Sequence, residues 1–142
     1  MRRPFKILFR VLFALYVVAV LFLCFGKFSQ TPNVPLVILG IPTDKLVHFL
    51  MFFPFPILAF LSFDRFTETV RSTLAFTGAT FVVGILLALG TEWGQAHLTD
   101  YRSGDRLDLL ADITALALST VLVIAWDIFK QHRARKCEKS SS

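Results

Sequence analysis

The sequence contains little charge, few cysteines and none of the common catalytic motifs. Only 18% of its 142 residues are charged, and no charged residue occurs from Thr73 to Gly90 or from Ile113 to Trp126. Its two cysteines, Cys24 and Cys137, fall in an apolar run and in a basic tail, which excludes a disulfide framework. Nucleotide-binding loops, Gly-x-Ser-x-Gly elbows and paired-cysteine motifs are also missing. Nucleotide, serine-hydrolase and redox functions therefore have no support.

Apolar residues make up 55% of the chain, and they include 16 phenylalanines. Four apolar runs reach the length of about 20 residues that a helix needs to cross a bilayer. These runs cover about residues 7–25, 46–63, 72–90 and 109–126. We therefore predict an all-α fold, an integral membrane four-helix bundle. One transmembrane domain, 7–129, is expected between a basic amino-terminal segment, 1–6, and a disordered basic tail, 130–142.

Lysine and arginine are distributed unevenly between the segments that connect these runs. If the runs cross the membrane in turn, 11 of the 15 basic residues lie on the side of the two termini, and 4 lie on the other side. Because cytoplasmic segments carry the excess of basic residues, we predict that both termini are cytoplasmic. Basic tails beside anionic lipid then account for the net charge of +5 without nucleic acid as a partner.

The second run begins with an ionisable group of residues, Asp44-Lys45-Leu-Val-His48. On a helix these three side chains share one face, and a carboxylate one turn from an imidazole can fix its tautomer for acid–base catalysis. A merely polar helix mouth is the alternative. Pro54 and Pro56 follow in the middle of the run and should bend or break the helix. The bend either opens a cleft beside His48 or serves packing alone.

A dense polar segment from Glu92 to Asp112 separates the last two runs, and it holds five of the ten acidic residues. Glu92 and Gln95, three residues apart, share one helical face. Asp105, Asp108 and Asp112 fall within an arc of about 60° on a helix. An uncompensated charge near the centre of a spanning helix costs about 2.5–3.5 kcal/mol. These carboxylates therefore need compensation.

The sequence offers three ways to balance these carboxylates. Lys45, Arg102 and Arg106 are the available protein cations. A divalent metal bound by His48 and the carboxylates is the second way, and a proton retained on one acid is the third. One histidine among scattered acids is a weak ligand set, so we favour a lysine and arginine network over a metal, and we predict no cofactor.

This set of polar positions resembles the VanZ-like family, small multi-span membrane proteins named after a bacterial factor linked to teicoplanin resistance. The resemblance covers Thr43 to Val121. The matching positions are Asp44, Lys45, His48, Glu92, Gln95, Arg102 and Asp108. The family usually has asparagine where this chain has Asp112 and glycine where it has Ala115, so the detailed site chemistry can differ. The resemblance implies a role in the bacterial cell envelope and a place in the cytoplasmic membrane; it supplies no established reaction.

Three hypotheses about function follow, and they share one site. The candidate catalytic residues are His48, Glu92 and Asp108, and the candidate substrate-binding residues are Asp44, Lys45, Gln95, Arg102 and Asp112. In the first hypothesis, an enzyme acts on a lipid-linked envelope substrate, with His48 or Glu92 moving a proton. Lys45 or Arg102 would hold a phosphate or carboxylate of that substrate. In the second, the protein binds a glycopeptide or an envelope precursor without a reaction. In the third, the polar residues only lock helices together in membrane lipid. The oligomeric state stays open.

Overall fold

Helices dominate the part of the chain that the computed structural model describes, residues 3–26, 37–38, 40–63, 67–98 and 105–140. The elements in chain order are α1 (Arg3–Phe25), β1 (Val37–Ile38), β2 (Ile41–Pro42), α2 (Thr43–Phe52), α3 (Pro54–Phe63), α4 (Val70–Leu98) and α5 (Arg106–Ser140). The two strands form one short antiparallel pair, and Gly40 turns between them with a φ of 81°. This small hairpin precedes α2 directly.

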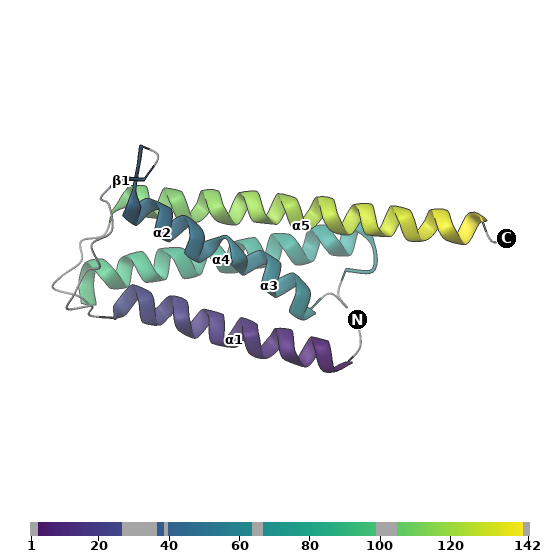
Figure 1. Ribbon diagram of the computed structural model, residues 1–142, viewed down its shortest axis with the longest axis horizontal. Coiled ribbons are helices and arrows are strands. Elements are labelled where there is room, and N and C mark those ends of the chain that lie inside the picture. The colour runs from purple at the N-terminus through teal and green to yellow at the C-terminus, as the bar shows by residue number, and fades with distance from the viewer. Residues whose placement is uncertain (1–2, 27–36, 39, 64–66, 99–104, 141–142) are drawn as a thin grey trace.

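Four segments of these helices are long and apolar enough to cross a membrane. They are Phe5–Phe25, Thr43–Phe63, Val70–Leu98 and Arg106–Cys137. The segments lie side by side as a bundle, which confirms the predicted all-α four-span fold of a multi-pass membrane protein (Figure 1). The start of α1 and the end of α5 lie at the same end of this bundle, as an even number of spans requires. We call this the termini end.

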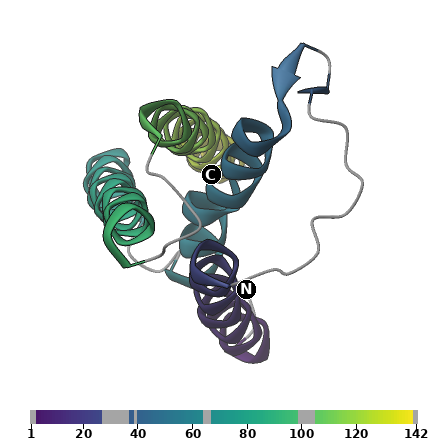
Figure 2. The same ribbon diagram turned by 90° about the vertical axis from the view of Figure 1, so that its left-hand side faces the viewer.

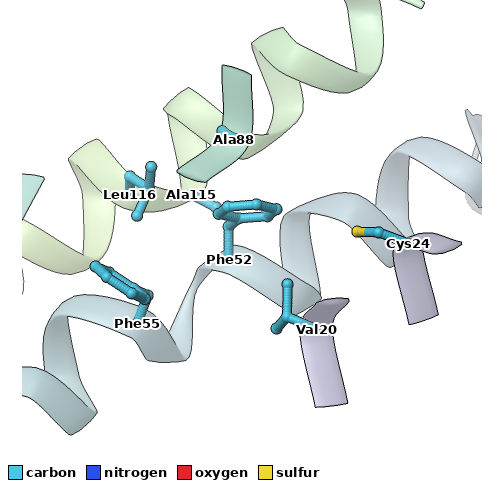
Figure 3. Close-up of a cluster of buried hydrophobic side chains, with 7 residues drawn as sticks. All are labelled: Val20, Cys24, Phe52, Phe55, Ala88, Ala115 and Leu116. Carbon is cyan, nitrogen blue, oxygen red and sulfur yellow. The ribbon is translucent and has the colours of Figure 1, made fainter. Parts of the chain in front are cut away.

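The broken helix formed by α2 and α3 lies between the other helices. Helix α5 packs against α2, α3 and α4, whereas α1 packs mainly against α3 (Figure 2). The buried core lies where these helices meet (Figure 3). Its members are Val20, Cys24, Phe52, Phe55, Ala88, Ala115 and Leu116. Many other large apolar side chains are exposed, such as Leu86 at 63% and Val121 at 61%. Outward-facing apolar side chains fit a bundle that is surrounded by lipid.

The break between α2 and α3 occurs at the predicted prolines. Helix α3 begins at Pro54, whose nitrogen has no hydrogen to donate to the Leu50 carbonyl. At the break, the Tyr16 hydroxyl of α1 donates a hydrogen bond to the Met51 carbonyl. An apolar cavity of about 300 Å³ lies beside it, between α1 and α2. His48 is buried, with 6% of its surface exposed, so the break does not uncover this histidine, and beyond it α3 packs against α1.

The carboxyl-terminal part of the chain differs from the prediction. We expected a disordered tail from residue 130 onward, whereas α5 continues as a helix to Ser140. No glycine or proline occurs after position 104, and lysine, arginine, glutamine and alanine are good helix formers. Basic side chains near a helix carboxyl terminus also interact favourably with its dipole. The helix therefore extends beyond the apolar segment, where the sequence had predicted that order would end.

Candidate functional site

Polar side chains from α2, α4 and the start of α5 come together at the end of the bundle opposite the termini end. We call this set the acidic cluster. It consists of Asp44, Lys45, His48, Glu92, Asp105, Asp108 and Asp112. Asp105 directly precedes α5, and its Oδ1 accepts a hydrogen bond from the Leu107 N–H at 2.9 Å, which caps the start of the helix.

Lys45 lies among three of these carboxylates. Its Nζ donates to Asp44 Oδ2 at 2.9 Å, to Asp108 Oδ1 at 2.6 Å and also to Asp105 Oδ2. The Lys45 and Asp108 side chains are each 13% exposed, whereas the Asp44 side chain is 58% exposed. An exposed ion pair contributes little to stability, so the partly buried contact with Asp108 matters most. The lysine hydrogen bond also holds the pKa of the Asp105 carboxyl below its ordinary value.

His48 lies between two aspartates of α5. Its Nδ1 is 3.2 Å from Asp112 Oδ1, and its Nε2 is 3.7 Å from Asp108 Oδ2. Asp112 is completely buried. When Asp112 is ionised it only accepts hydrogen bonds, and Nδ1 then carries the proton between them while Nε2 faces the second carboxylate. His48 Nε2 without a proton and an ionised Asp108 are both acceptors. Their contact therefore needs a second proton on the ring, a proton on Asp108 or a bound cation. This arrangement is suited to moving a proton.

Of the two alternatives for the start of α2, the pairing of His48 with Asp44 is wrong. Asp44 bonds to Lys45 and is exposed, and the carboxylate that orients His48 is Asp112 on another helix. The reason is how α2 docks: it packs along α5 and buries His48 there, while Asp44 stays in the exposed first turn. Asp112 was expected only as a substrate-binding residue, but its contact with the ring makes it a positioning residue for His48.

Glu92 and Gln95 have different partners despite sharing a helical face. Glu92 Oε1 accepts a hydrogen bond from the Asp105 backbone N–H, which ties α4 to the start of α5. Its Oε2 is buried and has no hydrogen-bond partner within the described ranges. Gln95 Nε2 instead donates to the Cys24 carbonyl of α1 at 3.1 Å. Glu92 therefore belongs to the acidic cluster, whereas the hydrogen bond from Gln95 to Cys24 fastens α4 to α1.

Of the two arginines expected in the charge network, the structure describes Arg106 alone. Arg102 lies outside the described residues. Arg106 is exposed, and within the part of the chain that the structure describes it makes no ion pair. Five described carboxylates of the cluster then face one lysine and one histidine. Oxygens of Asp44, Asp105 and Asp108 lie within 4.8 Å of one another, close enough for a metal ion, and the Lys45 ammonium bonds to all three.

Sequence reasoning missed one buried acid, Asp127, near the termini end of α5. It is 1% exposed and accepts hydrogen bonds from Thr73 Oγ1 at 2.7 Å and from Gln131 Nε2 at 3.0 Å. The signal was present, because Asp127 follows directly on an uncharged apolar run and lies one helical turn before Gln131. Its hydrogen-bond partners identify Asp127 as a link between α4 and α5.

Comparisons with protein-family models, with curated proteins and with solved structures found no match. The resemblance to the VanZ-like family therefore depends on the spaced polar positions alone.

Proposed function

We propose that this protein is a VanZ-like protein of the bacterial cell envelope, with the acidic cluster facing outward from the cytoplasmic membrane. In this proposal the cluster binds or processes an envelope substrate, in a role linked to resistance to glycopeptides such as teicoplanin. The observation that carries the proposal is the series formed by buried Asp112, buried His48 and partly buried Asp108. Ionisable groups inside spanning helices are costly, so such residues are usually functional.

The charge of the cluster favours a ligand group that is cationic. Lys45 already bonds to three carboxylates, so it is poorly placed to hold a phosphate; Arg102, the other residue expected to do so, lies outside the described residues. The excess of acids would repel an anion and attract an ammonium group. A lipid-linked precursor or a glycopeptide with a free amino group fits this charge. His48 would then exchange a proton with Asp108 or with the bound amine.

The test is a glycopeptide susceptibility comparison in a deletion strain, with the membrane abundance of each variant measured in parallel. The strain would carry wild type, His48→Ala, Glu92→Gln or Asp108→Asn. His97→Ala is the matched control, because His97 is exposed on α4 and contacts the Trp93 carbonyl at 2.9 Å, outside the cluster. We expect lost protection at normal abundance for the three cluster variants and full protection for the control. Full protection in all variants would overturn the proposal.

A purely structural role is the second candidate, because Lys45 and His48 both join α2 to α5. Its test is a double-mutant cycle of His48→Ala and Asp112→Asn, measured as free energies of unfolding of the purified proteins in detergent. A lock between the helices predicts a coupling energy of about 0.5–3 kcal/mol. It also predicts that protection falls only in proportion to the amount of folded protein. A coupling near zero would exclude the lock.

A further inference from the structure

A second feature lies near the termini end, on the lipid-facing side of α1, and it is independent of the acidic cluster. Helices α1, α3 and α4 enclose an apolar cavity of about 240 Å³, which we call the α1–α4 groove. Phe13, Phe63 and Phe76 form its walls, one from each helix. Ala79 and Val83 also line it and are exposed, Val83 at 55%. The groove therefore opens sideways, toward the hydrocarbon of the bilayer.

Figure 2 shows how the helices that line this groove are arranged. Helix α1 stands on the opposite side of α2 and α3 from α5, and it contacts α4 less closely than it contacts α3. The space that remains between α1 and α4 is lined by aromatic and small side chains. The hydroxyl of Thr80, the one polar side chain of the lining, bonds to the Phe76 carbonyl of its own helix at 2.9 Å. The lining thus suits a hydrocarbon chain.

Arg10 lies at the rim of the groove. Its Nε donates to the Ser62 carbonyl at 3.3 Å, and its guanidinium carbon lies 5.4 Å from the centre of the Phe63 ring, which is a wall of the groove. Over the described ranges, Arg10 has no carboxylate partner. It nevertheless lies within the membrane-spanning segment Phe5–Phe25. A cation at this depth calls for an anion, and its remaining N–H groups can donate to one.

We propose that the α1–α4 groove and Arg10 together bind one anionic phospholipid. Its acyl chain lies along Phe13, Phe63 and Phe76, and its phosphate accepts hydrogen bonds from the Arg10 guanidinium, which matches phosphate geometry well. The site lies in the leaflet at the termini end, where basic segments attract anionic lipid.

The charge part of the proposal is tested with purified full-length protein in detergent. Native mass spectrometry would compare retained phosphatidylglycerol with retained phosphatidylcholine of the same acyl chains. We expect wild type to retain the anionic lipid about tenfold better, as one charge-assisted contact implies. Arg10→Gln should abolish this preference. Arg133→Gln is the matched control, and this variant should retain the preference. Arg133 is exposed on α5, and its guanidinium carbon lies 5.7 Å from the centre of the Phe129 ring.

The groove itself is tested by filling it. Ala79→Leu places a larger side chain at the open side and should lower the retention of both lipids, whereas Ala117→Leu, at an exposed alanine of α5, should leave it unchanged. Equal retention of the two lipids by wild type, or an unchanged preference in Arg10→Gln, would overturn the proposal. Unchanged lipid retention in Ala79→Leu would also overturn the proposal. If the protein proves to be a dimer and Ala79→Leu makes it a monomer while lipid retention stays unchanged, the occupant of the groove is a second copy of the chain.

Discussion

Lys45 is the residue on which the charge balance of the acidic cluster depends. It is one described cation bonded to three carboxylates, and two of these belong to the start of α5. Two carboxylates about 5 Å apart repel each other by roughly 3 kcal/mol at an effective dielectric constant of 20. Without the ammonium, Asp105 and Asp108 would repel each other and Asp44. The lysine therefore allows α2 and α5 to meet through acidic side chains.

We expect Lys45→Met to lower stability at neutral pH, by an amount that shrinks in acid. In wild type the Lys45 hydrogen bond holds the pKa of Asp105 below 3.8. Asp105 therefore contributes stability that is fully present above about pH 4 and is lost as the pH falls through the lowered pKa. In Lys45→Met this contribution is absent at every pH, so the melting temperatures of the two proteins should converge below about pH 4.

Thermal unfolding of both purified proteins, from about pH 7 to about pH 3, measures this convergence. Lys130→Met is a suitable control, because Lys130 is 61% exposed and its Nζ lies 3.9 Å from Asp127 Oδ1. Asp127 is buried but keeps its hydrogen bonds from Thr73 and Gln131, and a long contact from an exposed lysine contributes little, so this variant should follow wild type. A constant difference between wild type and Lys45→Met over the whole pH range would contradict the role assigned to the Lys45–Asp105 hydrogen bond.

At the scale of elements, α4 and α5 approach each other closely at one glycine. A Cβ added to Gly84 would lie 2.7 Å from Leu116 Cδ2 and 3.3 Å from Phe55 Cδ1, whereas one added to Gly78 would meet nothing within 4 Å. Leu116 is completely buried, so its side chain has little room to move away. Helices in lipid associate through close packing of small residues, because lipid supplies no hydrophobic force between them. Gly84 therefore fixes how closely α4 and α5 can pack.

We expect Gly84→Ala to be less stable than Gly78→Ala by about 1–3 kcal/mol, the usual cost of overpacking. Both substitutions change the intrinsic helix propensity by the same amount, so their difference isolates the contact with Leu116 and Phe55. Equilibrium unfolding in mixed detergent micelles measures both free energies. Equal stabilities would mean that the helices can separate at Gly84 without cost.

At the scale of the whole molecule, local patterns were predictable and contacts between helices were not. The spans follow from apolar length, and the shared face of Asp105, Asp108 and Asp112 follows from the helical period, because both are properties of neighbouring residues. The contact between His48 and Asp112 joins residues that are 64 positions apart. The contact exists because α2 docks on α5, which the sequence of α2 alone does not reveal. Within α2 the carboxylate one turn from His48 belongs to Asp44, and that was the wrong partner. The burial of Asp127 depends in the same way on Thr73 of α4.

The two ends of the bundle also differ in charge, and this difference predicts the orientation of the protein. We expect Cys137, which is exposed near the end of α5, to react with a membrane-impermeant maleimide only from the cytoplasmic side. Intact cells should give no labelling and inverted vesicles full labelling, with Cys24 silent because it is buried. In a Cys137→Ser background, Asp44→Cys should show the opposite pattern, since position 44 is exposed at the other end. Labelling of Cys137 from outside would place the acidic cluster in the cytoplasm, where no extracellular glycopeptide could reach it.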